Sequence, residues 1–355
     1  MHLERPDLSQ VDPTVLAYIE ALEAENERLR ASERDTEAET APESAELDIP
    51  LEPNEPATTL NLITISGSGL AKRTPRHLYS RQRRGGMGIF DLETNEADPP
   101  AFLVIADESQ TLILFTNRAR AFRLPVSDLP ESPVHSRGQS LTDSLGLLPN
   151  ERLAAVLPDQ SGGSVAFLTE RGYVRCLPAH LFGEKMNPEM AAYKFEELGP
   201  LVAARWTSGN SDLFIATRRG LAIRFPEKQV PLPGGLGIRL DGDDAPVALA
   251  AVRPENGVFL LSADGRGTIR LMSGFNANKA PGGGGKVAMK TDQLIGAVTM
   301  DEADDIFIIS RLSKIIRFQA AEVPAKEGVV QGVNCMALRA DETVAVARSF
   351  AVQQA

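Results

Sequence analysis

An apolar segment of five residues that recurs at a nearly constant interval constrains the fold of this chain more than any other feature of its sequence. Its closing Ser or Thr residues are separated by 50, 53, 48, 45 and 48 residues. Short apolar runs are typical of buried strands, and strands repeated at such intervals are typical of propeller blades. We therefore expect an all-β fold, a six-bladed propeller. The six copies are LITIS (62–66), LILFT (112–116), VAFLT (165–169), LFIAT (213–217), VFLLS (258–262) and IFIIS (306–310).

Basic residues recur in register with these segments. After each closing Ser or Thr comes a turn and then a second strand that carries a base. Because the bases share one register, we expect their side chains to line up along one outer edge of the propeller, where they would attract an anionic polymer. These bases are Lys72 with Arg73, Arg120 with Arg123, Arg175, Arg224, Arg270, and Lys314 with Arg317.

The most basic stretch of the chain spans residues 61–90. It contains six Lys and Arg residues and no Asp or Glu, and it includes the run Gln82-Arg83-Arg84-Gly85-Gly86-Met87-Gly88. Glycines permit turns with positive φ and let a backbone approach a ligand or another strand closely. We expect the arginines to lie here beside exposed main-chain N–H groups, which is an arrangement that suits phosphate.

This run resembles the gyrase-A box, the seven-residue signature of the C-terminal DNA-wrapping domain of DNA gyrase A. Six of the seven positions fit, and Met87 stands where the family usually has lysine. Residues 233–239, 280–286 and 327–333 keep the glycines without the paired arginines. The resemblance covers residues 60 to about 350. It implies a six-bladed pinwheel, a propeller-like ring in which the box helps to join the first and last blades.

The resemblance implies a domain that binds double-stranded DNA without sequence preference and bends or wraps it around the basic rim without cleaving it. The box would anchor the duplex, and the bases of other blades would continue its path. The implied DNA-binding residues are Gln82, Arg83, Arg84, Gly85, Gly86 and Gly88 of the box, Lys72, Arg73, Arg76 and Arg81 beside it, and Arg118, Arg120, Arg123, Arg175, Arg224 and Arg270 farther along.

Two other functions stay open. The propeller would serve as a platform that docks on gyrase or other chromosome-associated proteins, or it would supply wrapping to a separate topoisomerase. Only about sixty residues precede the first repeat, which leaves no room for a DNA-cleavage domain with its active-site tyrosine. We therefore expect no enzymatic activity.

The acidic charge of the chain is concentrated before the repeats. The formal net charge is −11, and residues 1–59 contain sixteen acidic residues against four arginines. The rest has 33 basic and 32 acidic residues, so it can carry a local basic track. Residues 34–59 have almost no large apolar side chains, which predicts a disordered acidic linker. That linker would be either a DNA mimic that competes for the basic rim or a solubilising tether.

Residues 1–33 are predicted to contain a helix that starts at Asp12-Pro13. Val15, Leu22 and Leu29 recur every seven residues. The segment 15–30 would therefore form either a short parallel coiled coil, which would make a homodimer, or a single amphipathic helix.

The remaining features predict a cytoplasmic, nucleoid-associated protein. No apolar run approaches the length of a membrane span, and the first residues contain no signal core. The four histidines are scattered without ligand spacing, so we expect no metal, and no motif indicates a cofactor or a catalytic residue. Cys176 and Cys335 lie far apart, in apolar segments that resemble strands, and are expected to be thiols of the core.

Overall fold

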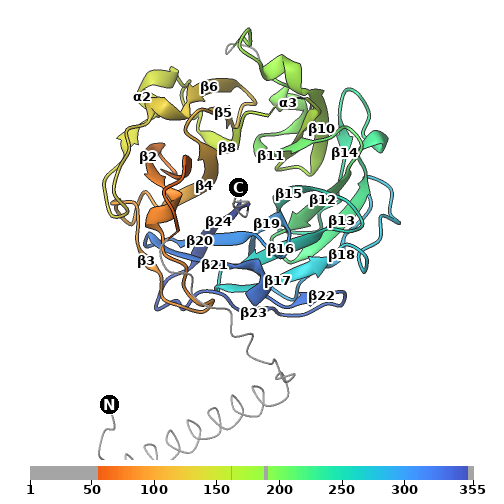
Figure 1. Ribbon diagram of the computed structural model, residues 1–355. Helices are drawn as coiled ribbons and strands as arrows, with labels where there is room; N and C mark the ends of the chain where they lie inside the picture. The colour runs from red at the N-terminus through yellow and green to blue at the C-terminus, as the bar shows by residue number, and fades with distance from the viewer. Residues whose placement is uncertain (1–54, 161, 188–190, 351–355) are drawn as a thin grey trace, which may run out of the picture. The chain divides into compact units, whose positions relative to one another are not determined.

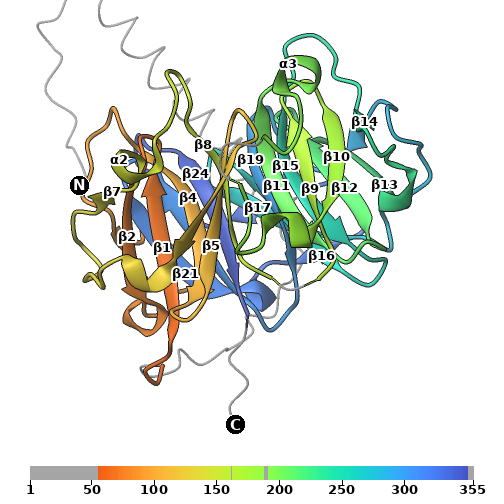
Figure 2. The ribbon, with the colours of Figure 1, turned by 90° about the horizontal axis from the view of Figure 1, so that it is seen from above.

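The computed structural model describes residues 55–160, 162–187 and 191–350. The predicted helix in 1–33, with its dimerisation segment 15–30, and nearly all of the linker at 34–59 lie outside these ranges. No described helix has the length and hydrophobicity needed to span a bilayer. The strands form six sheets around a common axis (Figure 1), which confirms the six-bladed all-β architecture. Seen at right angles to that view, the longer strands run roughly along the axis (Figure 2).

The six apolar repeats are the central strands of the six sheets, and they define blades 1 to 6 in chain order. They are β1 (Leu60–Ser66), β5 (Thr111–Thr116), β9 (Ser164–Thr169), β12 (Asp212–Thr217), β16 (Gly257–Ser262) and β20 (Asp305–Ser310). Each pairs with a second strand, namely β2 (Leu70–Pro75), β6 (Ala121–Pro125), β10 (Tyr173–Pro178), β13 (Leu221–Pro226), β17 (Arg266–Leu271) and β21 (Lys314–Gln319).

On its other side each central strand pairs with an inner strand, and the inner strands surround the axis. They are β4 (Pro100–Asp107), β8 (Leu153–Pro158), β11 (Leu201–Thr207), β15 (Pro246–Val252), β19 (Leu294–Met300) and β24 (Thr343–Ser349). Short outer strands complete most blades: β3 (Ile89–Phe90), β7 (Gln139–Ser140), β14 (Gly235–Leu236), β18 (Lys286–Val287), β22 (Ala325–Lys326) and β23 (Val333–Asn334). The short helices are η1 (Arg76–Leu78), η2 (Val126–Asp128), η3 (Ala179–Phe182), η4 (Glu227–Gln229), η5 (Ala320–Glu322), α2 (Thr142–Leu145) and α3 (Phe195–Leu198).

The closing Ser or Thr of each repeat has a local structural reason. All six are buried, and in four blades the hydroxyl accepts a hydrogen bond from the N–H four residues later, which tightens the turn into the second strand. In blade 1, for example, Leu70 N donates to Ser66 Oγ at 3.0 Å. Short hydroxyl side chains commonly cap turns in this way. The recurring hydroxyl therefore marks the end of each central strand.

The outer strand of a blade comes from the chain segment of the next blade. Thus β7, which follows β6 of blade 2, pairs with β2 of blade 1, and β14, β18 and β23 extend blades 3, 4 and 5 in the same manner. The strand β3 follows β2 of blade 1 but pairs with β21 of blade 6, with Ile89 opposite Ile315. This exchange closes the ring, as the resemblance to gyrase A implied.

A glycine precedes the outer strand at the same point in five blades. A Cβ on Gly88, Gly138, Gly234, Gly285 or Gly332 would lie 2.5–3.2 Å from the second-strand carbonyl of the adjoining blade. Real Cβ atoms rarely approach backbone so closely, so the absence of a side chain lets the exchanged strand dock. Each of the glycine-rich runs at 233–239, 280–286 and 327–333 therefore contains one glycine, Gly234, Gly285 or Gly332, that is structurally equivalent to Gly88 of the box.

Gly138 and Gly284 provide a matched test of this close approach, because neither has a positive φ. A Cβ at Gly138 would lie 2.5 Å from Ala71 O, whereas a Cβ at Gly284 would meet nothing within 4 Å. We expect Gly138→Ala to lower the free energy of unfolding by about 1–3 kcal/mol and Gly284→Ala to change it by less than about 0.5 kcal/mol. Urea denaturation measures both values, and equal losses would contradict the docking role.

Candidate nucleic-acid interface

The box lies against blades 5 and 6, and its main-chain groups are used to hold it there. Gln82 N donates to Arg317 O at 2.7 Å, Gly85 N donates to Cys335 O at 2.8 Å, and Gly86 O accepts from Ala337 N at 3.0 Å. The expectation that the box offers exposed N–H groups to phosphate is therefore wrong for these amides. The backbone of the box is an element of ring closure.

The three arginines around the box differ in what they offer to solvent. Arg81 Nε donates to Asp305 Oδ1 at 2.9 Å, and Arg84 folds back to donate to Glu322 O at 2.7 Å and Asn334 O at 3.1 Å. Arg83 has an exposed side chain, as has Met87 beside it. Of these arginines, Arg83 is therefore the one best placed to meet a ligand.

Lys72 belongs to a buried network behind the box. Its Nζ lies 2.8 Å from Asp91 Oδ1, and that carboxylate also accepts hydrogen bonds from Tyr79 Oη and Thr64 Oγ1, each at 2.6 Å. Burial lowers the pKa of Lys72, although the Asp91 carboxylate opposes that shift. Burial, with Asp91 beside it, raises the pKa of Tyr79 well above its ordinary value. Asp91 directly follows β3, so this network anchors the closing strand to blade 1.

In four blades the arginine that recurs on the second strand connects its blade to the next one. In blade 6, Arg317 Nη1 donates to Tyr79 O at 2.9 Å, just after η1 of blade 1. In blade 4, Arg224 Nη1 donates to Met272 O at 2.8 Å and Phe275 O at 3.0 Å in blade 5. Equivalent bonds join Arg73 to Leu129 O at 2.9 Å and Arg123 to Phe182 O at 2.6 Å.

These arginines also pair with carboxylates, so their charge is balanced inside the ring. Asp212 lies 2.8 Å from Arg224, and Asp159 lies 2.6 Å from Arg123. We call the four residues Arg73, Arg123, Arg224 and Arg317 the inter-blade arginines.

The prediction that the recurring bases form an outer DNA track is therefore corrected. The side chains are held between blades because the second strand is covered on both faces, and an arginine there reaches the carbonyls of the neighbouring turn. Arg76 is also buried and pairs with Glu55, and Arg270 is buried with its guanidinium 5.7 Å from the Phe275 ring. Burial removes the following residues from the proposed contact set: Lys72, Arg73, Arg76, Arg224 and Arg270.

The profile of the family described as "DNA gyrase C-terminal domain, beta-propeller" matches residues 60–98, 110–158, 211–253 and 304–349. These matches cover blades 1, 2, 4 and 6 and include the box and its closing contact. The chain belongs to the DNA gyrase C-terminal domain family.

Relatives and solved structures agree with this assignment. The chain is 28% identical to the DNA gyrase A protein of Klebsiella oxytoca over 294 residues, which is 80% of this chain and 34% of that protein. It is 28% identical to the Mycolicibacterium smegmatis gyrase A protein over 305 residues, 81% of this chain and 36% of that one. The chain thus spans about a third of the length of these relatives.

Two solved structures share the fold at 18% identity. A DNA gyrase A C-terminal domain has a TM-score of 0.69, with 81% of this chain and 99% of that chain covered. The C-terminal domain of DNA topoisomerase IV has a TM-score of 0.57, with 84% and 95% covered. At 18% identity, the similarity to these two structures shows a shared fold and no more.

Three of the predicted residues lie together in a groove of this gyrase-like ring. Arg118, Arg120 and Arg175 line a cavity of about 870 Å³ on blades 2 and 3, with Lys185 and Lys194. Arg120 pairs with Glu151 at 2.7 Å, and Arg118 lies 5.5 Å from the Phe195 ring centroid. Arg175 Nε is buried and has no hydrogen-bond partner within the described ranges. This groove is the place where candidate cations from separate repeats meet.

Other exposed cations lie in what we call the exchange segments, which link each second strand to its inner strand. These are residues 76–99, 126–152, 179–200, 227–245, 272–293 and 320–342. Sequence reasoning missed most of their cations. The spacing of the blades could have identified Arg137. Gly138 lies 50 residues after Gly88, so Arg137, which directly precedes Gly138, corresponds to Met87. The exposed bases are Arg83, Arg137, Arg152, Lys185, Lys194, Lys228, Arg239, Lys279, Lys290, Lys326 and Arg339.

Arg224→Met and Arg239→Met separate the two kinds of arginine. We expect Arg224→Met to lower the free energy of unfolding on the order of 3 kcal/mol, because Asp212 and two buried carbonyls lose their partner. Arg239 is exposed, so Arg239→Met should change the free energy of unfolding by less than about 0.5 kcal/mol. Thermal or urea unfolding measures the difference. A stable Arg224→Met variant would refute the inter-blade role.

The contact of Glu55 with Arg76 of blade 1 and Arg317 of blade 6 predicts a pH dependence of stability. Burial alone would raise the pKa of Glu55, but hydrogen bonds and charge from Arg76 and Arg317 hold it below its ordinary 4.5. A lowered folded-state pKa gives stability that is present above 4.5 and is lost as the pH falls through the folded value. Glu55→Gln should therefore be less stable than the wild type at pH 7, and the gap should narrow below pH 4.5. Unfolding midpoints across this range provide the measurement, and a constant gap would contradict the pairing.

Proposed function

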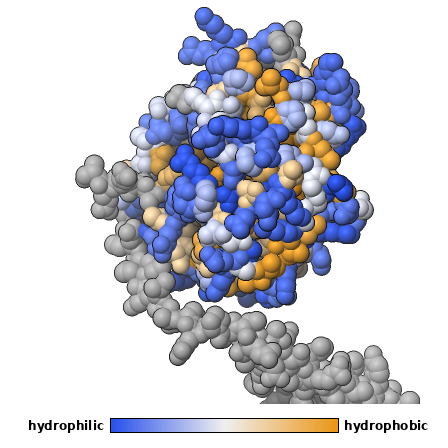
Figure 3. Space-filling view, turned by 90° about the vertical axis from the view of Figure 1, so that its right-hand side faces the viewer, coloured by the Kyte–Doolittle hydropathy of each residue, from blue (hydrophilic) through white to orange (hydrophobic). Residues whose placement is uncertain are grey.

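We propose that this ring binds double-stranded DNA along its outer edge without sequence preference and bends or wraps it, without cleaving it. The observation that carries the proposal is the presence of an exposed Lys or Arg in every exchange segment. These segments follow the outer strands around the ring (Figure 1), so their cations are spaced along one continuous circuit. Figure 3 shows one outer side of the ring, where hydrophilic residues predominate.

The interface we propose is discontinuous. The exchange segments carry eleven exposed bases and also twelve exposed Asp and Glu residues in the described ranges. A duplex would therefore contact cations at particular points, with Arg83 near the box and the groove of Arg118, Arg120 and Arg175 as two of them. Main-chain contacts at the box are not part of the interface, because those amides are occupied.

Bending is energetically feasible only with many such contacts. Smooth bending of 20–30 base pairs by 40–90° costs on the order of 1–6 kcal/mol. Neutralising about six to ten phosphates would offset this cost and would make affinity fall roughly 10³–10⁵-fold between 50 and 200 mM salt. Exposed pairs of opposite charge are also screened by salt, so the low-salt range is the informative one.

The family relation supports a role beside a topoisomerase. The relatives are named as DNA gyrase A proteins, and one structural neighbour is a domain of DNA topoisomerase IV. We propose that the ring acts on DNA topology as an accessory to such an enzyme, on the nucleoid in the cytoplasm. Without a DNA-cleaving partner it would constrain DNA writhe and leave both strands intact.

A topology assay tests wrapping directly. Plasmid is relaxed by a type I topoisomerase in the presence of the protein, the protein is removed, and the linking number is read on a gel. We expect a change in linking number that grows with protein concentration and disappears as the salt concentration rises. An unchanged distribution at saturating protein would exclude wrapping, and a shift with broken strands would exclude a non-cleaving role.

Substitution of the exposed arginines tests the proposed path. We expect the triple variant Arg83→Ala, Arg137→Ala, Arg239→Ala to weaken DNA binding and to flatten the slope of log K against log salt by about three units, since each lost phosphate contact contributes about 0.9. Fluorescence anisotropy with a labelled duplex gives both values.

The matched control is Arg253→Ala, an exposed arginine in the turn between β15 and β16. It should leave the slope unchanged, and both variants should keep the wild-type unfolding midpoint. Equal slopes for the triple variant and the wild type would show that DNA binds elsewhere.

A second candidate function is the docking of a protein at the box. Met87, Ile89 and Phe90 are 49%, 42% and 55% exposed, and neighbouring exposed apolar side chains are typical of interaction sites. Purified gyrase is a suitable probe. Binding of gyrase that survives nuclease treatment and is lost in Phe90→Ser would favour this function over DNA wrapping, provided that the protein causes no gel shift of DNA.

A further inference from the structure

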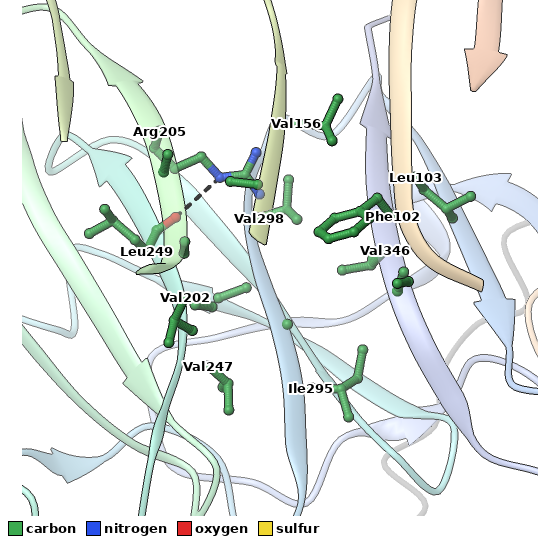
Figure 4. Close-up of a pocket in the computed structure, with 18 of the residues that line it drawn as sticks. Phe102, Leu103, Val156, Val202, Arg205, Val247, Leu249, Ile295, Val298 and Val346 are labelled. Carbon is green, nitrogen blue, oxygen red and sulfur yellow. Dashed lines mark hydrogen bonds between the residues drawn. The ribbon is translucent and has the colours of Figure 1, made fainter. Parts of the chain in front are cut away.

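The inner strands enclose an apolar cavity on the ring axis. It is lined by aliphatic residues of all six inner strands, among them Val156, Val202, Val247 and Ile295, and among the described residues Arg205 is the one charged residue of its lining (Figure 4). Next to it lies a second axial cavity of about 310 Å³, which Arg205 also lines. Arg205 therefore borders both cavities.

The register of the blades shows that Arg205 occupies an aliphatic position. It pairs with Ala166, three residues before the closing Thr169 of its blade. In the other blades the residues at this point are Val104, Leu157, Ala250, Val298 and Ala347, according to the same pairing. Five blades thus present a hydrocarbon side chain where blade 3 presents a cation.

The charge of Arg205 is not balanced within the part of the chain that the structure describes. Its Nε donates to Leu249 O at 3.2 Å, and no carboxylate lies within ion-pair distance among the described residues. Arg348, the other arginine of the second cavity, is paired, with its Nε 2.6 Å from Asp304. Arg205 is half-buried, and its partial desolvation lowers its pKa.

The second cavity offers groups that suit an anion. Besides Arg205, its polar lining includes Gln160, Trp206 and Thr299, and none of the described residues that line it is an Asp or Glu. Arg205 is half-buried, and a guanidinium partly withdrawn from water attracts an anion more strongly than one at the surface, because the effective dielectric is lower and its remaining N–H donors are fixed in direction. The Trp206 indole is held by its own bond to Pro158 O at 2.7 Å.

We propose that the second axial cavity is a binding site for one small anion, a halide or a compact oxyanion, held by the Arg205 guanidinium. The site lies on the axis and shares no residue with the proposed outer DNA path, so it is independent of the proposed function. The anion would supply the negative charge that the described side chains around Arg205 do not.

Trp206 makes the test direct, because it is the one tryptophan in the chain. Its emission is recorded, without DNA, during titration of the full chain with sodium phosphate, sodium sulfate and sodium chloride in dilute buffer. We expect a saturable change for at least one anion, with a matching rise in the thermal midpoint as ligand stabilises the folded state.

Arg205→Met is the decisive variant, since methionine fills the volume without charge. It should fold, as judged by circular dichroism, and should show no saturable response. Arg205→Lys should respond with an affinity about tenfold weaker, because a point charge replaces the planar fork. Arg239→Met, on the outer side, should match the wild type and controls for ionic strength. An equal response in Arg205→Met, or no saturation in the wild type with any of the three salts, would overturn the proposal.

Discussion

Five of the six blades of this ring depend on a neighbour for their outermost strand, and the close backbone approach at the exchange point makes that possible. A residue with a side chain at Gly88 would place a Cβ 2.6 Å from Ile315 O, inside the volume that the carbonyl occupies. The same geometry recurs at Gly138 and Gly332. Because β3 returns to blade 6, one local constraint on backbone approach is repeated around the ring and finally closes it.

The inter-blade arginines reinforce the same junctions from inside. Arg317 links blade 6 to the turn after β2, and Glu55 and Asp305 balance its charge. A buried arginine whose donors find carbonyls and carboxylates gives direction as well as energy to the contact. The ring is therefore held by hydrogen bonds with defined geometry in addition to apolar packing between blades.

The architecture could be predicted from the sequence because the period of the apolar segments and their closing hydroxyls have one structural meaning. The box at 82–88 lies, as expected, at the junction of the first and last blades. The fate of the recurring arginines could not be predicted, because both faces of a second strand are covered by neighbours and alternation does not distinguish inside from outside. Arg224 and Arg239 look alike in sequence, yet the first is buried and the second exposed. Arg137 was missed because it lacks a paired arginine, although its spacing to Gly88 repeats the interval of the blades.

Strand exchange has a consequence for how such a ring changes over time. A unit of some fifty residues cannot be removed or duplicated cleanly, since its loss would strip the preceding unit of a strand and leave that unit's backbone edge open. Recombination within the repeat array is thereby penalised, whereas single substitutions on exposed loops are not.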